Sequence, residues 1–253
     1  MDDGFKLRIT TFGGLCIEQA HGGAVCLQTD RTRALFLYLL NHRNHMVHRE
    51  AICATLWPDL GERQARAQLS KSLWRLRSAL DPDPVPEQAA VVGQSESLIG
   101  LRADRIDADC WRLADAVTAI EFKDDQDLTL ADAQKLSEVV RECQGTFCVG
   151  FFDDWCEHYR ELNGQLVLDA MSRLVGYHQV RSNWAMAISW GRRAVQIDPL
   201  REDLHLAIMS GYRAMGNRAS AMHQYHNCEQ ILANEMQVAP SDEMRSLYQD
   251  LAH

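Results

Sequence analysis

The side chains best suited to binding chemistry in this sequence lie between Arg63 and Leu80, where cations, amides and hydroxyls recur at helical spacing. Lys71, Trp74 and Ser78 fall on one side of such a helix, and no acidic residue interrupts the stretch. Lysine and arginine neutralise phosphates, and arginine, glutamine and serine donate hydrogen bonds to base edges. This face therefore suits a DNA groove. The pattern alone also describes the commoner solvated face of an amphipathic helix, so the neighbouring elements must decide.

The candidate DNA contacts on this stretch carry a positive charge, an amide, a hydroxyl or an indole: Gln64, Arg66, Gln68, Lys71, Trp74, Arg75, Arg77 and Ser78. The lysine and the three arginines are expected to be the main cationic contacts. Trp74 is the residue least expected on a solvated helix face. Its indole is interpreted as packing on a sugar or a thymine methyl, or alternatively on a neighbouring hairpin.

Apolar residues on the opposite side of the same stretch predict how the helix is held. They recur at steps of three and four: Ala65, Leu69, Leu73, Leu76 and Leu80. One apolar stripe of this kind predicts an amphipathic helix with a buried back. Arg66 and Arg77 border the stripe, where long side chains lie along apolar surface and still reach outward.

Short strands are predicted ahead of the helices. Leu7–Thr11 alternates apolar and polar residues, as a half-buried strand does. Leu15–Ile17 and Val25–Leu27 flank a His-Gly-Gly turn and are expected to pair with each other. Residues 5–28 are therefore predicted to form a small antiparallel sheet.

Two helices are predicted between this sheet and the basic stretch. Thr29 or Asp30 is the expected cap of a helix over Arg31–Asn41. A shorter helix over His48–Leu56 ends before Pro58, because proline disfavours helical backbone in the residue that precedes it. Three helices with a short connection before the third predict a helix-turn-helix, whose last helix enters the major groove.

A hairpin is predicted directly after the basic stretch. Ala90–Gly93 and Leu98–Leu101 are interpreted as two short strands joined by Gln94–Ser97. A hairpin next to a recognition helix is a candidate wing, although its tip carries Glu96 and no lysine or arginine. Further candidate DNA contacts lie on the two earlier helices and at this tip: Arg31, Arg33, Arg49 and Ser95.

The charge of the chain is divided unevenly between its two parts. The 253 residues carry a net charge of −9. Residues 1–103 contain 12 Lys and Arg against 11 Asp and Glu, whereas residues 104–253 contain 14 against 24, a net of −10. Because phosphates repel an acidic surface, this asymmetry predicts a DNA-binding domain over 1–103 and a protein-binding domain over 104–253.

Helical periodicity continues through the acidic part of the chain. The predicted helices are Cys110–Ile120, Leu130–Cys143, Trp155–Val180, Trp184–Gln196, Glu202–Met215, Arg218–Gln237 and a last one from Ser241. Positions 34 apart repeat in type: His178 with Tyr212, Ser182 with Gly216, Asn183 with Asn217, Ala187 with Ala221, and Ala194 with Cys228. That period is typical of tetratricopeptide repeats, whose concave surfaces hold a peptide, a partner helix or a small effector. Unrelated helical hairpins are the alternative, and the recurrence in register argues against them.

These elements together predict a mainly α fold with a small β component. We expect an N-terminal winged helix with an antiparallel sheet and a wing hairpin, followed by an all-α, tetratricopeptide-like repeat domain. The longest apolar run, Ala34–Leu40, is far shorter than the roughly 20 residues that span a bilayer. The acidic start of the chain is also unlike a signal peptide. We therefore expect a soluble, cytoplasmic protein with no membrane contact.

Groupings suited to metal binding or catalysis are weaker. The eight cysteines form no CxxC pair and are expected to be reduced and mostly buried. A redox sensor or a metal site is the alternative for three that lie close in sequence: Cys143, Cys148 and Cys156. His42, His45 and His48 lack an evident fourth ligand and are interpreted as polar loop residues. With no nucleophile elbow and no glycine-rich phosphate loop, we expect no enzyme and no cofactor.

Taken together, these motifs resemble the SARP family of bacterial regulators, which joins an OmpR-type winged helix to a bacterial transcriptional activator domain. The resemblance covers nearly the whole chain. It rests on the segments Leu7–Gly14, Arg31–Leu35, Leu56–Asp59, Ala67–Arg77, Gly150–Trp155, Asp198–Glu202 and Ala219–Tyr225. His48 departs from the pattern, because the family tends to have serine or threonine at that helix cap.

The resemblance implies a transcriptional activator that binds direct repeats beside a promoter −35 element, with two protomers on each site. It also implies contact with RNA polymerase or its σ factor. The alternative is a helical-repeat scaffold, or a ligand or redox sensor, whose winged helix contacts proteins. DNA binding at two salt concentrations distinguishes these functions, because phosphate contacts are salt-dependent.

Overall fold

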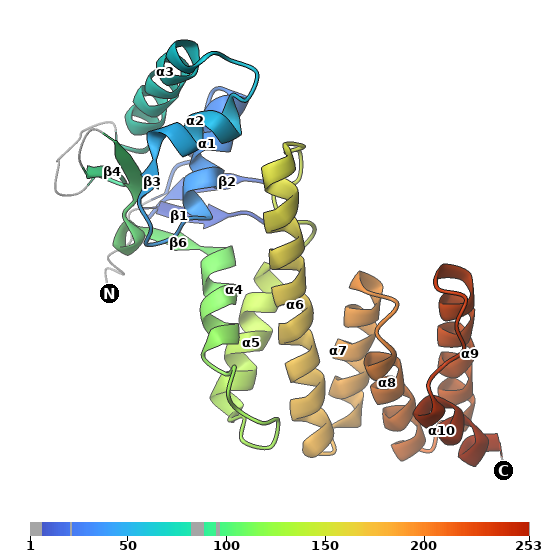
Figure 1. The fold of residues 1–253 in the computed structure, drawn as a ribbon. Helices are drawn as coiled ribbons and strands as arrows, with labels where there is room; N and C mark the ends of the chain where they lie inside the picture. The colour runs from blue at the N-terminus through green and yellow to red at the C-terminus, as the bar shows by residue number, and fades with distance from the viewer. Residues whose placement is uncertain (1–6, 21, 82–88, 95–96, 253) are drawn as a thin grey trace. The chain divides into compact units, whose positions relative to one another are not determined.

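The computed structural model describes residues 7–20, 22–81, 89–94 and 97–252. The chain forms two compact units, each made of two stretches. The first unit comprises Met1–Arg112 with Gln144–Leu162, and the second comprises Leu113–Cys143 with Asn163–His253. Helices dominate both the element order and Figure 1, in agreement with the predicted mainly α fold. The first unit extends past residue 103, so the division of function at that point stays a prediction.

The first sheet combines two neighbouring strands with one from much later in the chain. β1 (Leu7–Thr10) pairs antiparallel with β2 (Cys16–Gln19) and parallel with β6 (Ile106–Ala108). The expected strand Val25–Leu27 contributes instead one backbone hydrogen bond, from Val25 N to Ile17 O at 2.8 Å. In β6, Ile106 and Ala108 are buried and Asp107 is partly exposed, but three residues are too few for the sequence to have indicated a strand.

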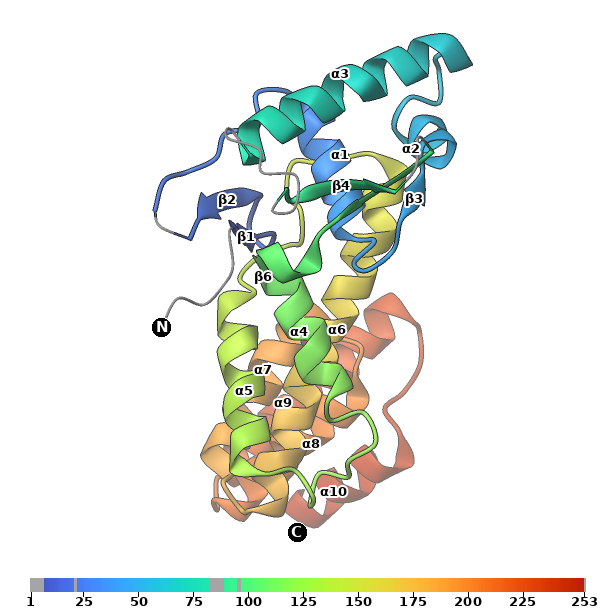
Figure 2. The same cartoon turned by 90° about the vertical axis from the view of Figure 1, so that its left-hand side faces the viewer.

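Three helices follow, as the sequence predicts. They are α1 (Asp30–Leu40), α2 (Arg49–Leu56) and α3 (Glu62–Leu80). The Thr29 hydroxyl caps α1 by accepting a hydrogen bond from Thr32 N, which satisfies one of the orphan amides of the first turn. α3 packs on both other helices and lies along the outside of the first unit (Figure 2).

The predicted wing hairpin is present as β4 (Val91–Gln94) and β5 (Leu98–Leu101). A third strand, β3 (Val47–His48), joins this sheet beside β5, with Val47 opposite Ile99. Two residues carry no alternation signal, and His48 was predicted to start the following helix, which begins instead at Arg49. The hairpin tip at residues 95–96, including Ser95, lies outside the described residues.

A segment from the acidic part of the chain completes the first unit. Cys148 N donates to Thr11 O at 2.8 Å, and Gly13 N donates to Thr146 O at 3.0 Å. Beside these bonds the rings of Phe12 and Phe147 meet edge to face, with centroids 5.7 Å apart. The backbone of Gly13 is left-handed, and a Cβ there would lie 2.9 Å from Gln144 O. Glycine is therefore required at this close approach.

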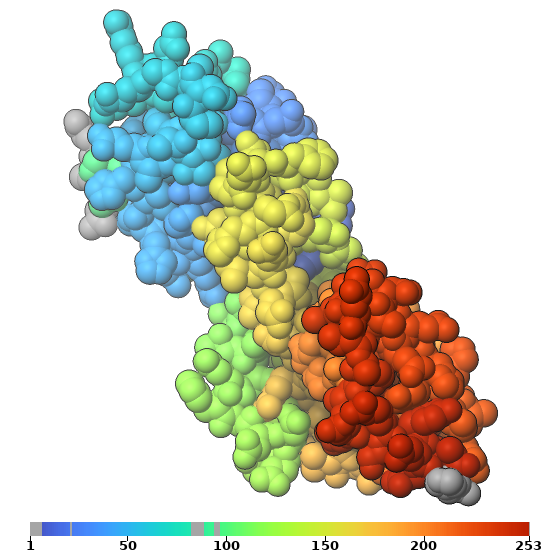
Figure 3. Space-filling view, turned by 45° about the vertical axis from the view of Figure 1, so that its right-hand side comes forward, coloured from blue at the N-terminus to red at the C-terminus, as the bar shows by residue number. Residues whose placement is uncertain are grey.

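Helices form the second unit. α4 (Asp109–Thr118) and α6 (Asp154–Val180) begin in the first unit and continue into the second. The other helices are α5 (Leu130–Glu142), α7 (Trp184–Ile197), α8 (Glu202–Ala214), α9 (Arg218–Glu235) and α10 (Asp242–Ala252). α7 packs on α8, α8 on α9, and α10 on both α8 and α9, and these elements appear orange to red in Figure 3.

The predicted repeat of 34 residues appears as repeated turn geometry. Ser182 and Gly216 both adopt left-handed backbone, with φ of 55° and 72°. The next residue in each turn, Asn183 or Asn217, caps the following helix through its side-chain oxygen. The backbone N–H of each asparagine also donates a 2.8 Å hydrogen bond to the backbone carbonyl five residues earlier. The two helix hairpins therefore share one turn design.

Small residues allow the helices of the repeat to approach closely. A Cβ on Gly191 of α7 would lie 2.8 Å from Ile208 Cγ1, and one on Gly211 of α8 would lie 2.8 Å from Ile188 Cγ1. Each isoleucine thus packs over the glycine of the facing helix. Larger side chains at these glycines would force the helices apart.

His205 of α8 is fully buried and has hydrogen-bond partners on both ring nitrogens. Nε2 lies 3.0 Å from Pro199 O, a pure acceptor, and Nδ1 lies 2.6 Å from the amide nitrogen of Gln224. This pair suits a neutral ring, which donates from Nε2 and accepts at Nδ1. Burial lowers the pKa of His205, and this effect outweighs the raising influence of Pro199 O and nearby carboxylates.

We expect His205 to make the second unit less stable in mild acid. Below about pH 6.5 an unfolded histidine binds a proton that the folded His205 excludes, so the free energy of unfolding falls as pH drops towards the lowered folded pKa. His205→Gln should reduce this slope, whereas the exposed His223→Gln should leave it unchanged. Guanidinium unfolding of all three proteins between pH 5 and 8, as an approximate range, measures the slopes. Equal slopes for all three would contradict the assignment.

Candidate nucleic-acid interface

α3 separates buried apolar residues from an exposed polar face. Gly61 caps the helix, and Glu62 places a carboxylate in its first turn, where the helix dipole favours negative charge. The buried residues are Ser72 and the whole predicted stripe: Ala65, Leu69, Leu73, Leu76 and Leu80. Of the contacts on α3 that the sequence predicted, Arg75 is half-buried. The others are exposed: Gln64, Arg66, Gln68, Lys71, Trp74, Arg77 and Ser78. The helix thus presents these side chains together.

Three cations of this face are free to bind an anion. The side chains of Lys71, Arg75 and Arg77 form no hydrogen bond or ion pair within the part of the chain that the structure describes. Ser78 and Gln68 add neutral donors on the same exposed surface. Binding of a phosphate or a base edge by these side chains would therefore break no existing salt bridge.

Arg66 is already paired, unlike those three cations. Its guanidinium lies 2.7 Å from Glu62 Oε1, one helical turn earlier, and 2.9 Å from Glu50 Oε1 of α2. Both carboxylates are largely exposed, so each pair is weak and exchangeable. Arg66 must nevertheless give up these partners, or share them, before it can bind a phosphate.

Trp74 presents a large apolar surface to solvent from the middle of this face. Its side chain is 68% exposed, and no ring contact with another described residue accompanies it. An indole this exposed can stack on a sugar or contact a thymine methyl. The alternative, in which it packs on the wing, is not seen among the described residues.

A depression of about 400 Å³ lies where α2, α3 and the wing meet. It is lined by His48, Arg49, Glu50, Arg66, Ser70 and Ser97. Arg49 connects the three elements, because its backbone N donates to Ser97 O at 2.8 Å and its Nη2 to Ser70 Oγ at 3.3 Å. The N-cap residue His48 makes no side-chain capping bond, so the next amides of α2, those of Glu50 and Ala51, are not capped by its side chain, whereas the Arg49 amide is bonded to Ser97 O.

Sequence reasoning identified Arg49 but missed Ser70 and Ser97 as neighbours. Ser70 lies on α3 one helical turn after Arg66, so helical spacing could have suggested it. Ser97 approaches only through the pairing of β3 with β5, for which the sequence carried no signal. The depression is therefore a feature of the fold and not of any single motif.

The two arginines predicted on α1 are engaged elsewhere. Arg31 Nη1 lies 2.9 Å from Asp153 Oδ1, in the segment that completes the first unit. Arg33 pairs with Asp30 on its own helix. Among the described residues, no hydrogen bond or ion pair joins the side chain of either arginine to α3, and their role in binding DNA stays a prediction.

The cysteine and histidine groupings form no evident metal site. All eight cysteines are free thiols, and the described residues contain no cluster of three or more potential metal ligands. Cys148 and Cys156 are buried together, and their mutual hydrogen bond, with burial, raises the pKa of the Cys148 thiol. Similarly, no helix among the described residues is long and apolar enough to cross a membrane.

Comparison with known proteins relates most of this chain to transcriptional regulators. The family model for the bacterial transcriptional activator domain matches residues 108–252. The transcriptional regulatory proteins MoaR1 of Mycobacterium tuberculosis and of Mycobacterium bovis are each 24% identical over 246 residues, covering 90% of this chain and 73% of the relative.

A solved structure shares the fold. The structure of Mycobacterium tuberculosis EmbR in complex with a low-affinity phosphopeptide superimposes with a TM-score of 0.76 at 19% identity. The match covers 98% of this chain and 65% of the EmbR chain, so this chain spans about two thirds of that protein. Since the family model matches more than half of the chain, the protein belongs to the bacterial transcriptional activator domain family and is a transcriptional regulator of the SARP type.

Proposed function

We propose that the protein is a sequence-specific, DNA-binding transcriptional activator. In this proposal α3 enters the major groove of promoter DNA, and the acidic second unit contacts RNA polymerase or its σ factor. The observation that carries the proposal is the exposed face of α3, on which Lys71, Arg75 and Arg77 have no partner within the described part of the chain. Cationic side chains without intramolecular partners can bind phosphates without first breaking an ion pair.

In this proposal different parts of the interface make different contacts. Arg75, Gln68 and Ser78 carry donors suited to base edges, while Lys71 and Arg77 suit phosphates. The depression is proposed to hold a backbone phosphate, because Arg49 lines it at the start of α2, where the helix dipole favours an anion. Helix α3 would then supply sequence recognition and α2 would fix its register on the duplex.

The second unit is proposed to bind protein and not DNA. The second unit contains 17 Asp and Glu against 11 Lys and Arg, a net charge of −6, which opposes approach to phosphates. Its repeated helix hairpins resemble surfaces that bind peptides or helices. Two protomers on direct promoter repeats follow from the family resemblance, and they give each bound site two acidic units.

A paired binding and transcription experiment tests this function. Genomic fragments that the full chain selects from the native host supply the promoter, and purified host RNA polymerase holoenzyme reports activation. We expect the affinity to fall with salt at a logarithmic slope of about −0.9 for each neutralised phosphate, and transcription to rise on the selected promoter. Absence of specific, salt-dependent binding would favour the alternative in which the winged helix contacts protein.

A further inference from the structure

The loop between α4 and α5 exposes the most accessible large apolar side chain among the described residues. Phe122 is 95% exposed, and Leu130 at the start of α5 is 64% exposed. A single exposed apolar residue on a flexible loop would need no explanation. This loop, however, is held in place by a dense polar network, so the exposure of Phe122 requires an explanation.

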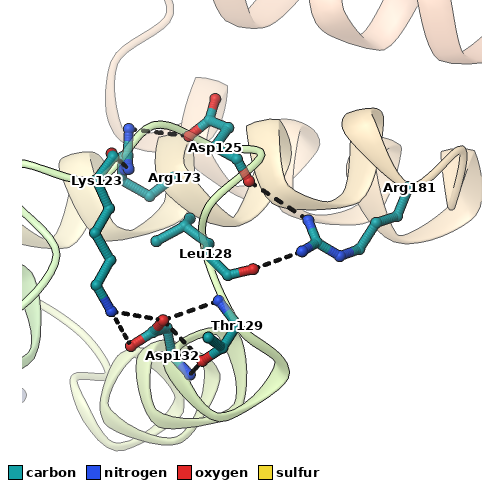
Figure 4. A network of polar contacts seen from close by, with 7 residues as sticks. All are labelled: Lys123, Asp125, Leu128, Thr129, Asp132, Arg173 and Arg181. Atoms are coloured by element: carbon teal, nitrogen blue, oxygen red, sulfur yellow. Dashed lines mark hydrogen bonds and ion pairs between the residues drawn. The ribbon is translucent and has the colours of Figure 1, made fainter.

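One side of the network lies on α5. Asp132 accepts two hydrogen bonds from Lys123 Nζ, at 2.9 and 3.0 Å. It also accepts from the backbone N and the hydroxyl of Thr129, and Thr129 in turn caps the helix. These bonds, led by the one from Lys123, lower the pKa of Asp132 to about 2, so the carboxylate stays ionised at neutral pH. Figure 4 shows Lys123 and Thr129 converging on Asp132.

The other side of the network lies on α6. Arg173 pairs with Asp125 at 2.9 Å and donates to Lys123 O. Arg181 donates to Leu128 O and to Asp125 O. Two arginines thus hold three carbonyls of the loop (Figure 4). Charge-assisted bonds of this kind, here partly buried, fix a loop more firmly than neutral ones do.

Gly176 lets the loop lie directly against α6. A Cβ at this position would be 1.9 Å from Asp125 Oδ2, so any other residue would displace the carboxylate that Arg173 holds. The loop is therefore ordered before any partner arrives. Docking of Phe122 would not have to order the loop, which removes a cost that flexible binding segments carry.

The charges beside Phe122 define the chemistry of a partner. Glu121, Asp124 and Asp127 are exposed and form no ion pair within the described residues. Lys123 and Asp125, by contrast, are neutralised inside the network. An apolar projection with three uncompensated carboxylates complements an apolar pocket rimmed by lysine or arginine. It repels phosphates, which excludes nucleic acid as the ligand.

We propose that residues 121–130, the acidic knob, dock Phe122 into a basic-rimmed apolar pocket on RNA polymerase holoenzyme. This inference rests on the proposed activator function and identifies which surface of the second unit makes the contact. Aromatic anchors at the centre of small contacts carry much of an interface's binding energy. The three carboxylates would orient the knob, and Phe122 would supply the affinity.

Substitutions in the full chain test the knob. Phe122→Ser should reduce activation about tenfold to a hundredfold with promoter affinity unchanged, because burial of a phenylalanine contributes that much to a contact. Phe122→Leu should retain most of the activity. Phe152→Ser is the matched control, since Phe152 of the first unit is 91% exposed and outside the knob. Wild-type activation by Phe122→Ser, or a parallel loss of its promoter affinity, would overturn the inference.

Photo-crosslinking gives a second measurement that does not depend on loss of activity. Benzoylphenylalanine replaces Phe122 in one protein and Phe152 in another, and each is irradiated in the complex with promoter and holoenzyme. We expect an adduct with a polymerase subunit from position 122. An adduct only with a second copy of this chain, or none from position 122, would overturn the proposal. If the wild-type protein binds promoter DNA but does not activate transcription, the proposed activator function is wrong. If the wild-type protein activates and Phe122→Ser activates equally well, only the proposal about the acidic knob is wrong.

Discussion

Replacing Lys71 and Arg75 together with alanine should weaken promoter binding by about 2 to 4 kcal/mol, roughly 30- to 900-fold. Both side chains belong to the polar face of α3 and have no polar partner among the described residues, so the free protein loses no side-chain hydrogen bond or ion pair. A phosphate contact and a base contact would be lost from the complex. The logarithmic salt slope should become shallower by about 0.9 for each lost phosphate contact. Electrophoretic mobility shifts at several salt concentrations measure both quantities.

A matched charge change provides the control for this experiment. Arg192 and Arg213 are exposed arginines of the second unit, and replacing both with alanine removes the same total charge. If net charge alone governed affinity, the two double variants would bind equally weakly. We expect the α3 variant alone to lose binding. Unchanged promoter affinity in Lys71→Ala, Arg75→Ala would remove α3 from the interface.

Asp109→Ala should destabilise the first unit by about 3 kcal/mol or more. The buried Asp109 carboxylate accepts hydrogen bonds from Thr11 N at 2.8 Å, Thr11 Oγ1 at 2.6 Å, Phe12 N at 3.2 Å and Cys110 N at 2.7 Å. Alanine leaves these donors buried without an acceptor, and each such loss costs about 1 to 3 kcal/mol. Guanidinium unfolding measures the change, and hydrogen exchange of β1 and β6 peptides assigns it to this unit.

Asp104→Ala is the corresponding control. Asp104 is an exposed carboxylate five residues earlier, and its removal should change stability by no more than about 0.5 kcal/mol. Asp109→Asn should fall between the two, because its amide retains one of the accepting oxygens. Equal stability of Asp109→Ala and Asp104→Ala would show that the four hydrogen bonds contribute little.

Long periodic segments were predictable from the sequence. The stripe from Ala65 to Leu80 defines which side of α3 is buried, and its face follows from helical spacing alone. The recurrence of Asn183 at Asn217 predicted a repeated hairpin, and both residues indeed cap a helix. Local spacing was sufficient in these cases because the residues that form each pattern lie within a few helical turns of one another.

Contacts between distant segments were not predictable in the same way. β6 pairs with β1 across about a hundred residues, and nothing in three residues of sequence indicates that pairing. The pairing of Arg66 with Glu62 follows helical spacing, but its pairing with Glu50 requires the packing of α2 on α3. No sequence pattern indicated the role of Asp109, because that role depends on the backbone amides of Thr11 and Phe12. These features come from tertiary packing, which one sequence does not display.

The structure of the full chain bound to a promoter duplex tests the central claim most directly. We expect α3 in the major groove, with Lys71, Arg75 and Arg77 within hydrogen-bond distance of phosphates or base edges. We also expect a backbone phosphate beside Arg49 and the first turn of α2. A complex in which the Lys71 face of α3 points away from the duplex, or contacts protein instead, would contradict the account.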